Sequence, residues 1–304
     1  MPELPEVETI AQQLDTALVN QTIRDIKVLR SKSFIGDKKL ITNRKIISVS
    51  RRAKILIIKL NKNQNLLIHL KMTGQLIYKK QDTSNKLQEI KNKKFTDNRP
   101  HFRIDNRIIG GHPSKDWFGK LPTSHTRVVL VLTQGTLFFN DMRVFGWVKQ
   151  VETKKLDSEF NNYGPDINSK YATPKYFHQF LQRSTQPVKI KIMDQSKVAG
   201  IGNIYANDAL HLAKINPTRP ANSLSKKESD LLLKSCKHVI ALGIKYGGAS
   251  ESDFIHLSGA GGKYQKHFRA YKKQGRKCPR NDRGVIKKIK LGGRGTFYCP
   301  ACQR

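Results

Sequence analysis

The apolar residues of this chain change their spacing part-way along its length, and that change constrains the fold more than any other feature. From residue 20 to residue 151, apolar and polar residues alternate in short runs, which is typical of strands. After a polar stretch at residues 151–165, apolar residues recur every three or four positions, which is typical of helices. A chain of 304 residues can bury a core in each part. We therefore expect an α+β protein with a β domain first and a helical domain second.

The first part predicts a β-sandwich behind one leading helix, within residues 1–150. The helix opens near Pro5, which suits a first helical turn, and its apolar residues recur at helical spacing as far as Leu18. Strands are expected at residues 22–29, 46–52, 54–60, 65–71, 75–78, 127–133, 136–140 and 147–151. Between residues 79 and 122 the strand pattern lapses, and Gly110 and Gly111 belong to a turn-like cluster, so we expect a long loop.

The second part predicts three helices, at residues 174–182, 187–194 and 202–213, followed by a longer one. Ser225 and Glu228 form a capping box that opens the long helix, and Gly247 ends it. Cys236 falls on the apolar face of this helix and is most simply a buried core thiol.

The charge of the chain indicates a polyanionic partner. Lys and Arg number 57 against 23 Asp and Glu, which gives a formal net charge of +34. Nucleic acid is the first candidate and an anionic membrane the second. The longest apolar runs are too short for a spanning helix, and the N-terminus lacks the apolar segment of a signal peptide. Three of the four cysteines fall in the last 27 residues, which favours a metal knuckle over disulfides and a cytosolic location.

The N-terminus carries a possible nucleophile. A small residue at position 2 normally allows removal of Met1, which would leave Pro2 as a free secondary amine beside Glu3, with Glu6 one turn further on. An α-amino group has a reference pKa near 7.7–8.0, so at neutral pH much more of it is unprotonated than of a lysine, and amines attack carbonyl-like carbons to give Schiff bases. The alternative is an ordinary start residue followed by solvated helix-start carboxylates.

Two basic or glycine-rich stretches indicate phosphate binding. Two glycines precede the helix start at Asn203, where free backbone amides can face an anion, although a tight turn explains them equally well. Lys54 stands at the beginning of an apolar strand, which places its amine at the end of that strand; a solvated strand terminus is the alternative.

Apolar residues next to an arginine predict a wedge for nucleic acid. Met72 and Phe145, with Arg143 close by, are the kinds of residue that enter a duplex and fill the space left by an extruded base. Spacing alone favours a place in the core for both apolar residues. In the basic tail, Cys299 and Cys302 form half of a zinc knuckle, while the half that begins at Cys278 has Asn281 where a second cysteine would complete four thiolates.

Taken together, these segments resemble the formamidopyrimidine-DNA glycosylase family (Fpg or MutM type). The matching motifs are PELPEVET at 2–9, RRAK at 51–54, HLKMTG at 69–74, NDMRVFG at 140–146, VAGIGNIYA at 198–206 and GGRGTFYCPACQ at 292–303. The resemblance implies an N-terminal β-sandwich with a leading helix at 1–150, a linker at 151–165, a helix–two-turn–helix domain at 166–265 and a β-hairpin zinc-finger-type tail at 266–304.

The resemblance also implies roles for single residues. Pro2 would attack the sugar, Glu3 would protonate the ring oxygen, Glu6 would orient them, and Lys54 would reach a phosphate near the lesion. Met72, Arg143 and Phe145 would enter the duplex. The remaining DNA contacts would be His125, Lys189, Asn203 with the amides before it, and Arg294. The segment between residues 248 and 264 would close over the flipped base.

The activity implied is that of a bifunctional DNA glycosylase and AP lyase that removes oxidised purines, acts as a monomer on double-stranded DNA and consumes no external cofactor. The ligands of one zinc ion would be Cys278, Cys299 and Cys302, with Asp282 or a water in the fourth place. The runner-up is the endonuclease VIII type, which removes oxidised pyrimidines and usually begins PEGPE, whereas Leu4 stands here. A DNA-binding protein without catalysis is a third possibility. Lys71 also departs from the usual glycine of the family pattern.

Overall fold

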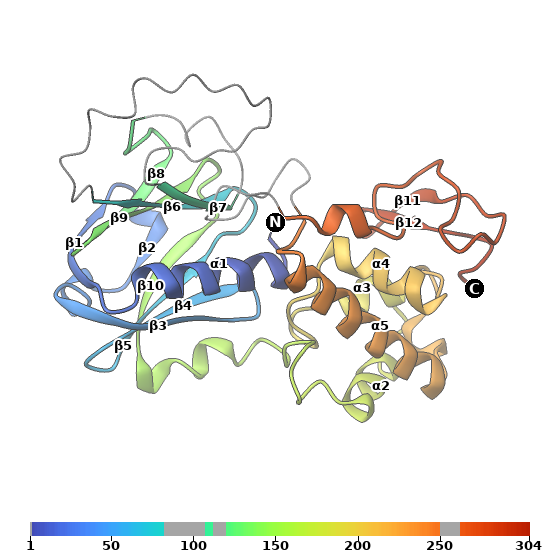
Figure 1. Ribbon diagram of the computed structural model, residues 1–304. Helices are drawn as coiled ribbons and strands as arrows, with labels where there is room; N and C mark the ends of the chain where they lie inside the picture. The colour runs from blue at the N-terminus through green and yellow to red at the C-terminus, as the bar shows by residue number, and fades with distance from the viewer. Residues whose placement is uncertain (1, 82–106, 112–119, 250–261) are drawn as a thin grey trace, which may run out of the picture.

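The computed structural model describes residues 2–81, 107–111, 120–249 and 262–304. It consists of a sheet lobe and a helical lobe that carries a small finger (Figure 1). Helix α1 (Leu4–Leu18) runs along the sheet lobe and points its N-terminal end at the helical lobe. Among the described residues the predicted α+β class, with a sandwich, a helical domain and a hairpin tail, is confirmed.

The sheet lobe is a ten-stranded sheet that folds over on itself into two layers, in the order β2-β10-β5-β4-β3-β1-β8-β9-β6-β7. Nearly all of its neighbouring strands are antiparallel; β2 and β10 pair in parallel. The strands are β1 (Thr22–Val28), β2 (Phe34–Ile35), β3 (Arg44–Arg52), β4 (Ile55–Leu60), β5 (Gln64–His69), β6 (Gly74–Lys80), β7 (Arg107–Gly111), β8 (Thr126–Leu132), β9 (Gly135–Asp141) and β10 (Trp147–Glu152). All eight strands expected from the alternating pattern are present, with ends shifted by one or two residues.

Strand β7 contradicts the loop expected between residues 79 and 122. Gly110 and Gly111 lie in this strand, which pairs with β6, rather than in a turn. A Cβ atom on Gly111 would stand 2.5 Å from the backbone oxygen of Gly74, and the φ of Gly111 is +114°. The glycine therefore serves a close approach of two backbones, and a strand with glycines at its end leaves no alternating signal in the sequence.

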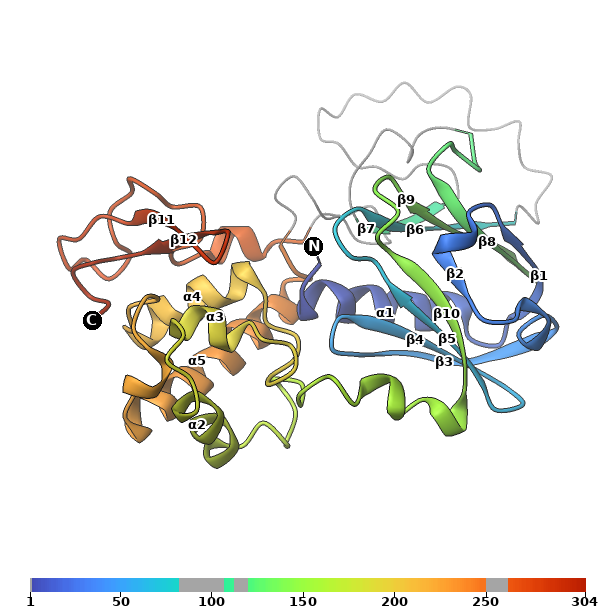
Figure 2. The same cartoon turned by 180° about the vertical axis from the view of Figure 1, so that it is seen from behind.

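The helical lobe is built on α2 (Pro174–Gln182), α3 (Val188–Ile192), α4 (Asn203–Ala213) and α5 (Lys226–Lys245). The four helices expected from the sequence are present, and Cys236 is fully buried among them as expected. After β10 the chain passes below the sheet lobe through short 3₁₀ turns and continues to α2 in the helical lobe (Figure 2). Phe160, in the second of these turns, is buried. The finger pairs β11 (Lys287–Leu291) with β12 (Arg294–Tyr298).

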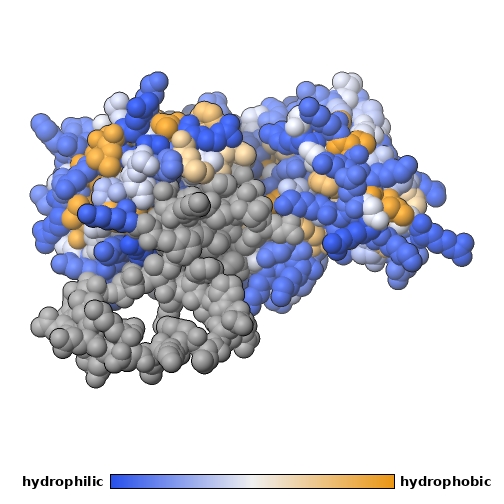
Figure 3. All heavy atoms as spheres, turned by 90° about the horizontal axis from the view of Figure 1, so that it is seen from above, coloured by the Kyte–Doolittle hydropathy of each residue, from blue (hydrophilic) through white to orange (hydrophobic). Residues whose placement is uncertain are grey.

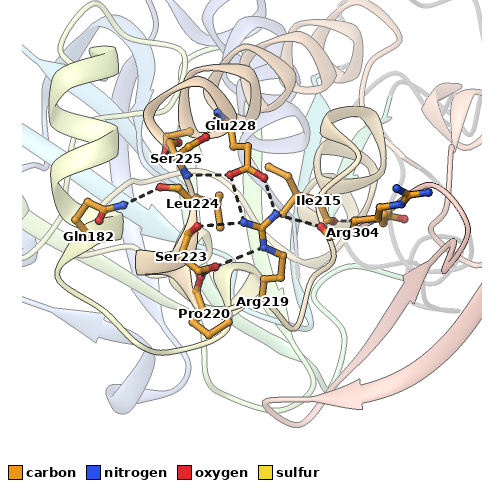
Figure 4. A network of polar contacts seen from close by, with 11 residues as sticks. Gln182, Ile215, Arg219, Pro220, Ser223, Leu224, Ser225, Glu228 and Arg304 are labelled. Carbon is orange, nitrogen blue, oxygen red and sulfur yellow. Dashed lines mark hydrogen bonds and ion pairs between the residues drawn. The ribbon is translucent and has the colours of Figure 1, made fainter.

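The predicted capping box of α5 is present and is joined to the end of the chain. The backbone amide of Ser225 donates to a carboxylate oxygen of Glu228 at 2.8 Å. Arg219 Nη1 donates to the other oxygen of Glu228 at 2.6 Å and to the backbone oxygen of Arg304 at 3.2 Å (Figure 4). The hydrogen bond from Arg219 is the main reason why the pKa of Glu228 falls to about 2. This network fixes the last residue of the finger against the start of α5.

Helix α1 contributes to both lobes. Most of its apolar residues, from Val7 to Leu18, pack in the core of the sandwich. Leu4 instead packs in the core of the helical lobe, and its backbone amide donates to the backbone oxygen of Gly200 at 3.0 Å. The first turn of α1 thus belongs structurally to the second lobe, although it lies at the start of the chain. The domain boundaries expected at residues 150 and 165 stay a prediction.

A buried arginine also joins the two parts of the chain. Arg51 on β3 donates from Nε to Glu8 on α1 at 2.7 Å and from Nη1 to Asp166 at 2.8 Å, and its side chain is 5% exposed. Asp166 additionally accepts from the backbone amide of Ala53 at 2.8 Å. The guanidinium therefore compensates two carboxylates at the boundary between the lobes.

We expect Arg51→Met to lower the free energy of unfolding by about 3 kcal/mol, because it leaves two poorly solvated carboxylates without their cation. The measurement is urea denaturation at neutral pH. The matched control is Arg24→Met, at an exposed position on β1, which should change stability by less than about 0.5 kcal/mol. Equal stability of the two variants would show that the buried pairs contribute nothing.

Candidate active site between the two lobes

The first turn of α1 places the predicted nucleophile and both carboxylates in the interior. Pro2, Glu3 and Glu6 are all buried, and Met1 lies outside the described residues. The amide of Glu3 donates to Glu6 Oε2 at 2.8 Å, which holds the turn in shape. The N-terminal end of the chain is therefore packed between the lobes.

The carboxylate of Glu3 is held by the N-terminus of α4. Its oxygens accept from the backbone amides of Gly202 and Ile204, both at 2.8 Å, and more weakly from Tyr205 at 3.4 Å. Free amides at a helix start favour a negative charge. The expectation that the amides before Asn203 hold a phosphate is wrong for Gly202, because Glu3 occupies that amide.

Burial leaves a substantial share of Glu3 protonated near neutral pH. Loss of solvent raises its pKa from 4.5 to about 7, and the nearby carboxylate of Glu6 adds to this. The charge of Lys54 and the backbone amides of α4 act in the opposite direction. Since burial is the larger effect, Glu3 can act as an acid at the pH at which a free α-amine is already partly unprotonated.

Glu6 is fixed by contacts from the second lobe. One of its oxygens accepts from the hydroxyl of Tyr205 and from the backbone amide of Ala249, each at 2.8 Å. Gly248, just before Ala249, has a φ of +80°, and a Cβ there would stand 2.7 Å from Glu6 Oε1. The carboxylate therefore fits into a space that a glycine leaves open.

Lys54 is buried with its amine at the end of β4, as expected from its place before an apolar strand. Its Nζ donates to the backbone oxygen of Ile201 at 2.9 Å. Burial lowers its pKa, the carboxylates of Glu3 and Glu6 oppose this, and Arg294 adds to it. Gln195, which the sequence gave no reason to select, also donates to Ile201 O, at 2.8 Å, and accepts from the amide of Gly200.

These groups surround one pocket of about 420 Å³ at the boundary of the lobes. Its lining includes the predicted residues Pro2, Glu3, Glu6, Lys54, Met72, Asn203 and Arg294. Gly202, one of the two glycines noted before Asn203, also lines the pocket. The sequence did not single out the other lining residues, which are Met193, Gln195, Ile201, Ile204, Ala249, Phe268, Tyr271, Lys272 and Gly295. Phe268 and Tyr271 provide aromatic surface, which suits a flat ring as ligand.

The wedge residues lie on two adjacent turns of the sheet lobe. Met72 is 46% exposed and Phe145 is 52% exposed, so the place in the core that spacing favours is wrong for both. The guanidinium of Arg143 lies 4.7 Å from the centroid of the Phe145 ring. The two turns therefore present an exposed thioether and an exposed ring next to a guanidinium, the kinds of group that can enter a duplex.

A buried aspartate shapes both of these turns. Asp141, which is fully buried, accepts from the hydroxyl of Thr73 on the turn that carries Met72. It also accepts from the backbone amides of Arg143 and Gly146, the latter at 2.6 Å. Val144 adopts a left-handed φ of +55° between them. Asp141 was not selected from the sequence because one aspartate after a strand carries no distinctive signal.

The remaining predicted contacts are placed in different ways. Lys189 is fully buried, and its Nζ donates to Asn203 Oδ1 at 2.7 Å and to Thr296 Oγ1 at 2.6 Å, so it joins α4 to the finger. Burial, with a contribution from Arg294, lowers its pKa to about 7. Arg294 is exposed at the start of β12. His125 is half-buried before β8, outside the pocket.

The finger brings three thiols together. Cys278, Cys299 and Cys302 form, with Asp282, a group whose possible ligand atoms all lie within 4.8 Å of one another. Sulfur ligands in so close a group fit one zinc ion. This zinc would be structural, because it lies in the finger, among residues that are absent from the pocket lining.

Asp208 on α4 anchors the segment that leads to the finger. It accepts hydrogen bonds from three backbone amides, at residues 269–271.

A possible amine nucleophile next to a buried acid, in a pocket of a strongly basic chain, is typical of enzymes that act on nucleic acids through a Schiff base. Comparison with known proteins agrees. Three family models match in chain order: formamidopyrimidine-DNA glycosylase N-terminal domain at residues 1–148, its H2TH domain at 163–254, and the zinc finger found in FPG and IleRS at 275–304.

Relatives match over the whole length. The formamidopyrimidine-DNA glycosylase of Pelotomaculum thermopropionicum is 34% identical over 312 residues, covering 100% of this chain and 99% of that protein. That of Thermus thermophilus is 32% identical over 309 residues, covering 100% and 98%. A solved complex of Lactococcus lactis Fpg (MutM) with DNA containing N7-benzyl-Fapy-dG shares 30% identity, with a TM-score of 0.81 over 100% of both chains.

The chain belongs to the formamidopyrimidine-DNA glycosylase family, whose members are DNA glycosylases of base excision repair with AP lyase activity. It ends in a zinc finger with a site for one zinc ion. Among the described residues, no helix is long and apolar enough to cross a membrane.

The glycine at the start of α4 should be necessary for activity. A Cβ on Gly202 would stand 2.4 Å from Glu3 Cδ and 2.6 Å from Glu3 Oε1. We expect Gly202→Ala to displace the carboxylate and to lower the rate of base excision by about 100-fold, as misplacements of about 1 Å do. Single-turnover excision is the measurement, and thermal unfolding of the variant shows whether the fold is kept. An unchanged rate would mean that the position of Glu3 is not critical.

Proposed function

We propose that this protein is a bifunctional DNA glycosylase and AP lyase that removes oxidised purines, namely 8-oxoguanine and formamidopyrimidines, from double-stranded DNA. The observation that supports this most directly is the position of Pro2, which lines the same pocket as Glu3 and Lys54. Once Met1 is removed, Pro2 is a secondary amine next to an acid whose pKa is about 7.

The chemistry follows from these two groups. The nitrogen of Pro2 attacks C1′ of the damaged nucleoside, and the bond from C1′ to the base breaks. Glu3 protonates the ring oxygen of the sugar, so that the ring opens and a cationic Schiff base remains between Pro2 and C1′. This cation acidifies the C2′ proton. Loss of that proton expels the 3′ phosphate, and a second elimination expels the 5′ phosphate.

The other residues would hold the DNA in place. Met72 and Phe145 enter the duplex and fill the space of the flipped nucleotide, while Arg143 faces the orphaned base. Lys54, Asn203 and Arg294 line the pocket and would contact the backbone next to the lesion. We assign Lys189 to the support of Asn203 and the finger, because its amine is buried between them. His125 stays a predicted backbone contact.

The charge of the molecule supports a DNA partner. The net charge is +34, and seen from above both lobes present mainly hydrophilic side chains outside the grey segments (Figure 3). Binding should therefore weaken steeply with salt through counterion release. We place the protein in the cytoplasm, acting as a monomer on chromosomal DNA. The segment expected to close over the flipped base lies mostly outside the described residues.

The experiment that tests the proposed substrate compares two lesions. One duplex carries 8-oxoguanine opposite C and the other carries thymine glycol, the substrate expected of the endonuclease VIII type. We expect excision of 8-oxoguanine to be faster by at least tenfold. The cut should leave a one-nucleotide gap with a phosphate on each of the two strand ends that face it. Preference for thymine glycol would favour the runner-up, and lesion binding without cleavage would favour a protein that only binds DNA.

The rate of excision should fall with rising pH once the Pro2 amine is fully unprotonated. Glu3 acts in its protonated form, and since its pKa is raised from 4.5 to about 7, about half of the acid is ionised at neutrality and the rest is lost above it. Near neutrality this loss is offset by the growing share of unprotonated Pro2 amine, so we expect the fall of tenfold per pH unit at higher pH, where each unit removes nine tenths of the remaining acid and the amine no longer changes. Single-turnover rates measured from pH 5 to pH 10 give this alkaline limb of the profile.

Two variants check the assignment of that limb. Glu3→Gln should lower excision by about 10²–10⁴-fold and abolish the limb, because an amide cannot donate a proton in this way. The control Glu152→Gln changes a half-buried carboxylate that pairs with Lys154 outside the lining of the active-site pocket, and it should keep both rate and profile. An alkaline limb that persists in Glu3→Gln would contradict the role of Glu3.

The exposed ring of the wedge should contribute to binding of lesion DNA. We expect Phe145→Ala to weaken affinity by about 10-fold to 100-fold, because one stacked aromatic contributes about 1–3 kcal/mol. Fluorescence anisotropy with an abasic-site analogue duplex measures this. The control is Tyr171→Ala, which removes a 68% exposed ring on the helical lobe and should leave affinity unchanged. Equal effects of the two variants would remove Phe145 from the interface.

A further inference from the structure

The finger has three cysteines, and its first knuckle carries Asn281 where a second thiol would complete a set of four. Asn281 is exposed and adopts a left-handed φ of +55°, and its backbone amide donates to Cys278 O at 3.1 Å. It therefore shapes the turn. The next residue in the chain, Asp282, belongs to the compact group of possible ligand atoms, within 4.8 Å of the three sulfurs.

The distances match a tetrahedral zinc site with one oxygen ligand. Zn–S bonds of about 2.3 Å and a Zn–O bond of about 2.0 Å give S···S edges of about 3.8 Å and S···O edges of about 3.5 Å. Cys278 Sγ and Cys302 Sγ are 3.9 Å apart. Cys299 Sγ lies 3.6 Å from Asp282 Oδ1 and 3.4 Å from Oδ2. Both kinds of edge are present without any rearrangement.

The turn after Cys278 delivers this carboxylate to the sulfurs. Asp282 Oδ1 accepts from the backbone amide of Gly284 at 2.9 Å, and the amide of Cys278 donates to Gly284 O at 2.8 Å. A Cβ on Gly284 would stand 2.4 Å from Cys299 Sγ and 2.9 Å from Asp282 Oδ1. The glycine thus leaves room for sulfur and carboxylate to meet.

A histidine on α4 is the competing candidate. His211 Nε2 lies 3.3 Å from Cys278 Sγ and 3.9 Å from Cys302 Sγ. His211 therefore lies beside two of the three sulfurs. Among the described residues, the group whose possible ligand atoms all lie within 4.8 Å of one another contains Asp282 and does not contain His211. An imidazole N–H beside a thiolate sulfur donates a hydrogen bond, which orients the ligand from outside the metal's own shell.

We propose that Asp282 is the fourth zinc ligand, so that the finger holds its metal through three thiolates and one carboxylate. Three thiolates and a carboxylate carry the same total charge as four thiolates, so the charge of the site is conserved where a neutral asparagine or a water would change it. His211 is a positioning residue that donates to Cys278. A carboxylate oxygen is a harder donor than sulfur, so this site should hold zinc less tightly than a four-thiolate site.

The first test measures zinc directly in the purified full-length protein, without DNA. Zinc content and competition with a chromophoric chelator should give one zinc per chain, and Asp282→Ala should weaken zinc binding by at least 10-fold. The matched control is Asn281→Gly, which changes the neighbouring side chain but keeps the left-handed turn, and should bind zinc as the wild type does. His211→Gln should retain the full zinc content with a smaller loss of affinity.

The second test counts thiolates with cobalt(II) in place of zinc, and it holds even where Asp282→Ala disturbs the finger. Sulfur-to-cobalt charge-transfer absorption grows with the number of thiolate ligands. Asp282→Cys should raise it by about one third over the wild type and should tighten metal binding. Unchanged absorption in Asp282→Cys, wild-type zinc affinity in Asp282→Ala, loss of zinc only in His211→Gln, or a wild-type protein without zinc would each overturn the proposal. None of these readouts depends on base excision.

Discussion

The structure depends on the contact between the carboxylate of Glu3 and the first turn of α4. The two partners are 199 residues apart along the chain, and their hydrogen bonds of 2.8 Å join the first turn of α1 to the second lobe. Glu6 strengthens the same junction through Tyr205 and Ala249. These contacts fix Glu3, the residue directly after Pro2, to the pocket that Pro2 lines. The pocket is thus a product of how the lobes are joined.

Two opposing effects act on Glu3 at this junction. The helix start and Lys54 stabilise its charged form, whereas burial destabilises that form and is the larger effect. The same burial lowers the pKa of Lys54, which is fully enclosed and donates to a backbone oxygen. The pocket therefore holds a carboxylic acid that is still partly protonated near neutrality, beside a buried lysine amine whose pKa is lowered. This suits chemistry in which protons move between a sugar and the protein.

Local patterns in the sequence were sufficient for most of the fold. Alternating and helical spacing identified eight strands and the helices, because each element buries one face against a core. Strand β7 was missed because it ends in two glycines, which read as a turn. The close contact of Gly111 with the backbone of Gly74 is visible only once β6 and β7 are paired. In the site, residue types selected Pro2, Glu3 and Lys54. Three features of the site depend on partners distant in sequence, which no local pattern records. They are the contact of Glu3 with the α4 amides, the burial of Lys189 against the finger, and the hydrogen bond that joins Asp141 to Thr73.

The central claim is that the N-terminal amine of Pro2 is the nucleophile. Borohydride reduction of the protein on DNA with 8-oxoguanine, followed by proteolysis and mass spectrometry, tests it directly. The account predicts a sugar fragment attached to the peptide that begins with Pro2, on chains that have lost Met1. An adduct on a lysine such as Lys54, or on chains that retain Met1, would contradict it.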